Sequence, residues 1–180
     1  PVAITVATGK AAEKGILIKS AASLELMGRV NTVVLDKTGT VTEGKPRVTD
    51  VLCAANVTEE ELLCAAASLE KPSGHPLADA IVQEAERRSI PLCAVSDFAA
   101  VAGGGVQAVQ DGKTLYAGND RYMESIGADT AALRDAAEML AAAGKTPLYF
   151  AEDRQLLGVI AVADVVKPDS AAAIAALRRS

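Results

Sequence analysis

The chain has 180 residues, enough for one large domain or two small ones with a buried core. Half of its residues are hydrophobic, but no apolar run approaches the roughly 18–20 residues that a membrane-spanning helix needs. The formal net charge of −5 argues against a basic surface for nucleic acid, so we expect no nucleic-acid partner.

The three cysteines, Cys53, Cys64 and Cys93, are scattered and form no CxxC pair. An odd, scattered set is typical of reduced thiols in a core rather than of a disulfide or a zinc site. No signal peptide is recognisable, so we expect the chain to lie in the cytosol.

The chain begins on an apolar run without a capping residue, as if cut from something longer. Residues 32–36, TVVLD, form a short and almost wholly apolar segment that predicts a strand of a parallel sheet covered on both faces. Residues 47–54 are strand-like. Thr58 and Glu61 form a capping box that starts a helix over residues 59–70. A second helix follows over residues 75–88, with Pro76 in its first turn.

Residues 92–118 predict strands, and Asp111-Gly112 between two of them is a strong hairpin signal. Asn119 can cap a short helix that Gly127 ends. An alanine-rich helix over residues 130–144 comes next. Two strands then flank a turn at residues 153–154, and a last helix opens at Pro168.

These elements predict an antiparallel α+β body inserted into an α/β domain. The body lies between the parallel-type strand at residues 32–36 and an α/β continuation from residue 157. We therefore interpret residues 47–156 as a second domain that interrupts the first one after its first strand.

Asp36 stands at the carboxyl end of the predicted parallel strand, where ligands bind in open parallel sheets. A carboxylate there can attack phosphorus and form an aspartyl-phosphate, provided that cations and loop amides offset the repulsion between the charges. Lys37, Thr38, Gly39 and Thr40 follow directly and meet that demand. The alternative, for an isolated Asp-Lys-Thr, is an Asx-turn at the end of a strand.

The whole heptad DKTGTVT resembles the phosphorylation motif of P-type ATPases, the cation pumps that form an aspartyl-phosphate in each cycle. The resemblance implies that Asp36 is the nucleophile, that Lys37 neutralises phosphate charge and that Thr40 contacts the phosphoryl group. It also implies that Asp36 and the main-chain oxygen of Thr38 coordinate Mg²⁺. The wider haloacid dehalogenase-like superfamily usually has a second Asp at the position of Thr38, and its loss here suits a pump more than a phosphatase.

Four weaker features fall inside the predicted insertion. Glu70 precedes His75-Pro76 by five residues, Gly103 and Gly105 form a G-x-G arrangement, and Asn119 follows Gly118. Chemically, an imidazole can stack on a purine, a carboxylate can accept from an exocyclic amine, and glycines allow close backbone approach. Taken singly, each is more typical of a helix start, a turn or a bulge.

Their order resembles the nucleotide-binding domain of heavy-metal pumps, the P1B branch, whose Ser-x-His-Pro signature matches residues 73–76. The resemblance implies that Glu70 and His75 bind adenine, that Gly103 and Gly105 line the cleft, and that Asn119 supports it. The segment 163–168 resembles the returning hinge, which implies that Asp164 and Lys167 lie near the phosphates. Gly74 stands where the branch often has Glu.

The resemblance extends over nearly the whole chain and assigns its parts. Residues 1–27 would be a membrane-proximal stalk segment, and residues 28–46 with 157–180 an incomplete Rossmann-like phosphorylation domain. Residues 47–156 would be the α+β nucleotide-binding domain with its antiparallel sheet. The implied cofactors are ATP and Mg²⁺. The implied partners are a heavy-metal ion, carried by a transmembrane part, and actuator and membrane domains of the same protein. The implied location is the cytoplasmic portion of an integral membrane protein of a bacterium.

Cu⁺ is the favoured ion, because it is the commonest choice in this branch, and Zn²⁺, Cd²⁺ or Pb²⁺ is the alternative. The alternative stays open because the metal selectivity of the branch resides in transmembrane residues. Three other hypotheses stay open: a free-standing phosphatase of the same superfamily, an ATP-binding module with a vestigial phosphorylation loop, and a metal-binding protein that uses the cysteines and His75. The 180 residues contain neither the Thr-Gly-Asp nor the Gly-Asp-Gly-x-Asn-Asp element that completes the family's Mg²⁺ site. We therefore expect the chain to bind ATP without turnover.

Overall fold

The computed structural model describes residues 2–179, which divide into two compact units between Asp36 and Lys37. The first unit holds helices α1 (Val2–Glu13) and α2 (Ala21–Met27), neither of which buries a residue. Ser20 caps α2 by accepting a hydrogen bond from the amide of Ser23. None of the helices among residues 2–179 is long and apolar enough to cross a membrane.

The strand predicted at residues 32–36 is not formed, and that prediction is wrong for this chain. The segment has no regular secondary structure, and Val34 in its middle is 92% exposed. A parallel strand is stable only when neighbours satisfy its backbone groups and cover its apolar faces. The sheet of the described chain includes no strand from residues 30–36, so the apolar pattern lacks the partners that it implies.

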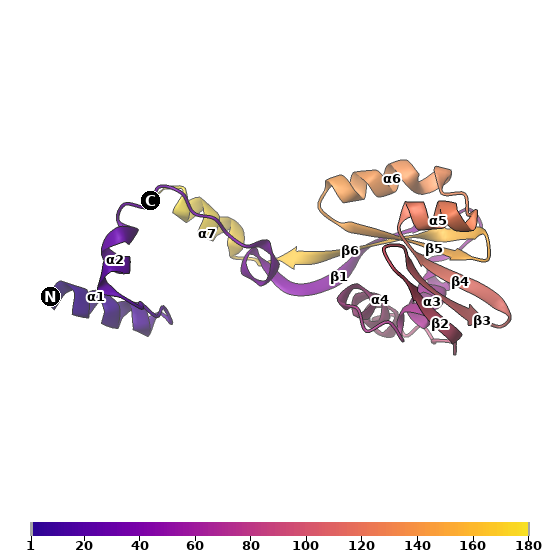
Figure 1. The fold of residues 1–180 in the computed structure, drawn as a ribbon, viewed down its shortest axis with the longest axis horizontal. Coiled ribbons are helices and arrows are strands. Elements are labelled where there is room, and N and C mark those ends of the chain that lie inside the picture. The colour runs from indigo at the N-terminus through magenta and orange to yellow at the C-terminus, as the bar shows by residue number, and fades with distance from the viewer. Residues whose placement is uncertain (1, 180) are drawn as a thin grey trace. The chain divides into compact units, whose positions relative to one another are not determined.

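The second unit is built on one six-stranded sheet in the order β1-β6-β5-β4-β3-β2, with every neighbouring pair antiparallel (Figure 1). Its strands are β1 (Thr42–Cys53), β2 (Ser96–Val101), β3 (Gly105–Gln110), β4 (Lys113–Gly118), β5 (Thr146–Glu152) and β6 (Gln155–Val166). The predicted antiparallel α+β body is therefore confirmed.

Helices cover both faces of this sheet (Figure 1). On one face α3 (Glu59–Glu70) and α4 (Pro76–Arg87) bury Leu62, Leu63 and Ile81 against strand residues such as Phe150 and Ile160. On the other face α5 (Asp120–Ile126) and α6 (Ala131–Ala142) enclose a second cluster around Met123. The last helix, α7 (Ser170–Leu177), follows β6. Burial of these two clusters supplies the main favourable free energy of folding.

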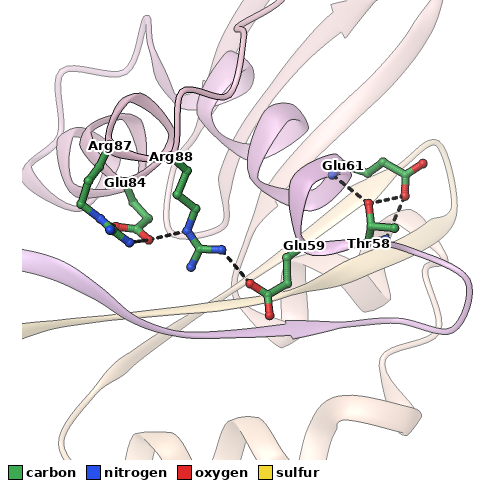
Figure 2. A network of polar contacts seen from close by, with 6 residues as sticks. All are labelled: Thr58, Glu59, Glu61, Glu84, Arg87 and Arg88. Atoms are coloured by element: carbon green, nitrogen blue, oxygen red, sulfur yellow. Dashed lines mark hydrogen bonds and ion pairs between the residues drawn. The ribbon is translucent and has the colours of Figure 1, made fainter.

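Short local motifs determine where several of these elements begin and end. Thr58 and Glu61 form the predicted capping box, with the amide of Thr58 donating to Glu61 at 2.8 Å and the amide of Glu61 donating back at 3.2 Å (Figure 2). Asp111-Gly112 joins β3 to β4, as predicted. Asn119 caps α5, and Gly127 ends it in the left-handed region.

Arg88 joins the two helices that form one face. Its guanidinium contacts Glu84 of α4 at 2.6 Å and Glu59 of α3 at 2.7 Å, and Arg87 pairs with the same Glu84 (Figure 2). These cations hold the pKa of Glu84 down at about 2. Arg88 therefore bridges the start of α3 and the end of α4, and this network adds to the apolar packing between the two helices.

The pairing of β1 with β6 brings distant parts of the chain side by side. Its register runs from Thr42 opposite Val166 to Cys53 opposite Gly158. A side chain at position 158 is excluded, because its Cβ would lie 2.4 Å from the carbonyl oxygen of Leu52. The pairing of β1 with β6 continues across the predicted domain boundaries at residues 46 and 156. The division into a nucleotide-binding and a phosphorylation domain therefore stays a prediction.

Candidate functional site

A cavity of 530 Å³ lies beside the ends of α3 and β4, the start of α4 and the turn between β2 and β3. Its wall includes all five residues that the sequence predicted for adenine binding: Glu70, His75, Gly103, Gly105 and Asn119. The volume falls in the range of small-molecule sites, which runs from about 300 to 1,000 Å³. The fold therefore gathers residues spread over fifty positions of sequence around one cavity.

Glu70 is the one strongly perturbed acid in this cavity. It is the last residue of α3 and only 7% exposed. Burial raises the pKa of Glu70 to about 7, although a hydrogen bond from the side chain of Ser73 opposes the rise. At neutral pH the carboxyl is therefore divided between its acid and its ionised form, and it can donate as well as accept hydrogen bonds.

His75 is exposed and stands at the N-cap of α4, where its side chain accepts a hydrogen bond. The amide of Leu77 donates to Nδ1 at 3.2 Å. An imidazole that accepts at Nδ1 carries its proton on Nε2, so the second nitrogen is left as a donor. The prediction that Pro76 occupies the first helical turn is confirmed, and this turn holds the ring at the edge of the cavity.

The glycines let two strands and a turn approach the cavity closely. Gly105 pairs with Gly118 across β3 and β4, and a Cβ on Gly105 would lie 1.8 Å from the carbonyl oxygen of Ala117. Gly103 has a φ of +72°, which L side chains rarely adopt. The predicted G-x-G element is therefore a backbone requirement of this wall.

Asn119 ties the glycine turn to α5. Its side-chain amide donates to the carbonyl oxygen of Gly103 at 3.0 Å, and its side-chain oxygen accepts from the amide of Tyr122 at 2.8 Å. Its own amide donates to Gly104 at 3.2 Å. Asn119 thus holds the turn in place whether or not it touches a ligand.

Sequence reasoning missed the apolar part of the wall. Leu77, Ala78, Val101, Val106, Ala117 and Leu148 also line the cavity. Such residues suit the flat faces of a purine, but in sequence they resemble ordinary core positions. Only the fold distinguishes them from the rest of the core.

The heptad begins at the division between the two units. Asp36 closes the first unit and is exposed, and the wide turn Lys37–Val41 (η1) opens the second. Thr38 (φ −75°, ψ 121°) and Gly39 (φ 75°, ψ −12°) have the angles of a type II turn, which needs glycine at its third residue. Lys37, Thr38 and Thr40 are all exposed on this turn.

Asp164 holds the far end of the heptad. Its carboxylate accepts from the hydroxyl of buried Thr42 and from the amides of Gly44 at 3.2 Å and Lys45 at 3.0 Å. The amide of Gly39 in turn donates to the Thr42 hydroxyl oxygen at 3.3 Å. The Asp164 carboxylate thereby fixes the turn, and its contact with phosphate stays a prediction.

Lys167 reaches the turn directly. Its ammonium donates to the carbonyl oxygen of Gly39 at 2.8 Å, and its amide donates to Val41 at 3.0 Å. Ser170 adds a hydrogen bond to the same Val41 carbonyl oxygen at 2.7 Å. The segment between β6 and α7 therefore holds the Lys167 ammonium beside the heptad.

Comparisons with known proteins place the chain in a family. A family model described as haloacid dehalogenase-like hydrolase matches residues 30–180. A copper-transporting P-type ATPase of Rhizobium leguminosarum bv. viciae is 47% identical over 180 residues, covering 100% of this chain and 21% of that protein. The probable copper-transporting ATPase PacS of Synechococcus elongatus is also 47% identical, covering 99% and 24%. The chain thus spans about a fifth to a quarter of the length of these relatives.

Solved structures agree with these relatives. A zinc-transporting PIB-type ATPase in its E2.Pi state superposes with a TM-score of 0.84 at 36% identity, covering 98% of this chain and 28% of that one. The N-domain of HMA8, a copper-transporting P-type ATPase, gives a TM-score of 0.57 at 27% identity, covering 65% of this chain and 99% of that one.

Replacing Glu70 by Gln tests the burial of this carboxyl. Because the pKa of Glu70 rises from 4.5 to about 7 on folding, the wild-type free energy of unfolding falls as pH rises through this window, by about 3 kcal/mol. Gln cannot ionise, so we expect Glu70→Gln to unfold at a higher temperature than the wild type at pH 8, with the gain shrinking towards pH 4.5. Thermal unfolding followed by circular dichroism at both pH values measures this.

The matched control is Glu86→Gln, at an exposed position of α4. It makes the same chemical change at an exposed carboxyl and serves as the comparison for the buried one. If Glu70→Gln gives no larger gain at pH 8 than at pH 4.5, the raised pKa of Glu70 is wrong.

Proposed function

The chain belongs to the haloacid dehalogenase-like hydrolase family, and on that premise we propose that it is the ATP-binding and phosphorylation region of a heavy-metal-transporting P-type ATPase. The observation that carries the proposal is the cavity that gathers Glu70, His75, Gly103, Gly105 and Asn119 in a chain that also contains the heptad DKTGTVT. Cu⁺ is the favoured ion, because the relatives at 47% identity are named for copper transport.

We assign the reading of adenine to Glu70 and His75. A protonated carboxyl donates through one oxygen and accepts through the other, which matches the ring nitrogen and exocyclic amine of adenine. Guanine presents a carbonyl oxygen and a ring N–H at the corresponding edge, which reverses the order of donor and acceptor, so it needs the proton on the other carboxyl oxygen. The Nε2–H of His75 provides a second donor or a stacking face, and Gly103 and Gly105 allow the base to lie against backbone.

We assign the chemistry to the heptad. A carboxylate oxygen of Asp36 attacks the γ-phosphorus of ATP, the bond from that phosphorus to the bridging oxygen breaks, and ADP leaves. Lys37 and Lys167 neutralise phosphate charge, and Thr38 and Thr40 offer groups on the exposed turn. Asp164 contributes by holding the turn through Thr42.

Mg²⁺ fits the oxygen donors that the heptad offers. Among residues 2–179 no group of three or more His, Cys, Asp or Glu side chains gathers to hold a metal ion. The Asp36 carboxylate and the main-chain oxygen of Thr38 would therefore hold the ion together with phosphate oxygens and water, as hard cations prefer. When bound, Mg²⁺ would offset the repulsion between the carboxylate and the triphosphate.

The parent protein would be an integral membrane pump, bacterial in origin, with this chain as part of its cytoplasmic portion. Its other partners would be the transported ion and the actuator and membrane domains of the same protein. A pump for Zn²⁺, Cd²⁺ or Pb²⁺ is the second candidate, since a zinc-transporting PIB-type ATPase superposes well. A free-standing phosphatase is less well supported, because Thr38 replaces the general acid that its superfamily usually has.

An amide NMR titration with ATP and GTP tests the nucleotide assignment. We expect ATP to shift the amides around the cavity, GTP to shift them less, and His75→Ala to weaken ATP binding about 10-fold, or about 1.4 kcal/mol. Asp97→Ala, at an exposed position outside the cavity wall, is the control and should bind as the wild type does. Equal responses to ATP and GTP, or an unchanged affinity in His75→Ala, would contradict the assignment.

Phosphate release over several hours tests whether the chain turns over. We expect ATP binding without sustained hydrolysis, because the elements that complete the family's Mg²⁺ site are not among the 180 residues. Asp36→Asn serves as the background control. Sustained phosphate release by the wild type that disappears in Asp36→Asn would contradict this expectation and favour the phosphatase.

A further inference from the structure

Two of the three cysteines meet in the folded chain. The sulfur atoms of Cys64, in the middle of α3, and Cys93, in the segment between α4 and β2, lie 4.0 Å apart. They are 29 positions apart in sequence, so their spacing gave no sign of a shared site. Neither belongs to the wall of the adenine cavity described above.

The backbone around this pair is held in place from both sides. The Cys64 thiol donates to the carbonyl oxygen of Pro91 at 3.2 Å, and the amide of Cys93 donates to the hydroxyl oxygen of buried Ser68 at 2.9 Å. These contacts fasten the segment of Pro91 and Cys93 along α3. The hydrogen bonds to Pro91 and Ser68 therefore hold the two thiols close together without a disulfide bond.

The pair is open to small solutes. Cys93 is exposed, and Cys64 is half-buried and lines a separate cavity of 640 Å³, together with residues such as Glu60, Val57 and Gln155. Burial raises the pKa of the Cys64 thiol, and the adjacent Cys93 adds to the rise. The Cys64 thiol therefore keeps its proton until a ligand displaces it.

The geometry suits a metal ion between the sulfurs. A metal–thiolate bond measures about 2.3 Å for zinc, so two such bonds span up to about 4.6 Å. A disulfide would need the sulfurs to close from 4.0 Å to about 2.05 Å. The observed separation is nearer to the bridged arrangement than to the disulfide.

The number of ligands selects the kind of ion. Structural zinc takes four ligands, and no cluster of three or more His, Cys, Asp or Glu side chains exists in the described part of the chain. Soft thiolates favour soft ions such as Cu⁺. We propose that Cys64 and Cys93 form a two-coordinate binding site for a thiophilic monovalent cation, Cu⁺ or Ag⁺.

Binding converts two thiols and one M⁺ into an M(S)₂ unit and releases two protons, with no change of oxidation state. The ion would fasten the Pro91–Cys93 segment to α3, the helix that ends in Glu70. Because only the folded chain brings the two sulfurs together, the ion also stabilises the fold by mass action. The site rests on the two thiols and is independent of whether the parent protein transports copper.

The test uses the full, reduced 180-residue chain without oxygen, with Cu⁺ supplied as its complex with bicinchoninic acid. The wild type should withdraw one Cu⁺ per chain and should unfold at a higher temperature when loaded. Cys64→Ser and Cys93→Ser should each lower the affinity for Cu⁺ at least 10-fold. Changes to residues that only support a metal ligand already cost about 10-fold or more, and these variants remove a ligand itself. Cys53→Ser, the matched control, should bind as the wild type does.

X-ray absorption at the copper edge should find two sulfur neighbours. If the wild type withdraws no Cu⁺, if both serine variants bind as well as it does, or if binding follows Cys53, the site does not exist. Circular dichroism shows whether each variant folds. Should Cys64→Ser unfold, Cys93→Ser at its exposed position decides the question alone.

Discussion

The antiparallel pairing of β1 with β6 is the constraint on which the rest of the structure depends. It pairs Thr42 with Val166, and it brings the Thr42 hydroxyl into hydrogen-bonding contact with Asp164, which is 122 residues away in sequence. The same ladder ends in the heptad turn on one strand and in Lys167 on the other. Gly158 permits it, because any side chain there would collide with the backbone of β1. Closing so long a loop costs conformational entropy, which the buried clusters on the two faces of the sheet offset.

Within this frame, the cavity departs from what stability alone would favour. The Glu70 carboxyl is 7% exposed and has no cationic partner among residues 2–179, so its ionisation costs free energy, which an uncharged Gln of similar size would avoid. Such local conflicts are expected at functional sites. Gly105 and Gly118, in contrast, are required by the backbone itself, because a Cβ at either position would collide with a neighbouring carbonyl oxygen. The buried carboxyl is therefore the feature that we attribute to ligand binding.

The sequence predicted well wherever the determinants are local. The capping box of Thr58, the turn at Asp111-Gly112 and the cap at Asn119 each depend on a few neighbouring residues, and all three are present. The five residues predicted to bind adenine were named from a family resemblance, and the fold adds that they share one cavity. The prediction of a strand at residues 32–36 was wrong, because a strand needs neighbouring strands that its own apolar pattern cannot supply. The burial of Glu70, the hold of Asp164 on Thr42 and the meeting of Cys64 with Cys93 are likewise long-range results of folding.

The most direct test of the account is a carbon-13 NMR titration of the Glu70 side-chain carboxyl, alone and with saturating ATP or GTP. We predict that the free carboxyl titrates near pH 7 and that ATP raises this pKa, because a ring nitrogen of adenine accepts the carboxyl proton. GTP should move this pKa less, because guanine offers its donor and acceptor in the reverse order. A carboxyl that titrates near pH 4.5 and ignores ATP would contradict both the buried carboxyl and its role in reading adenine.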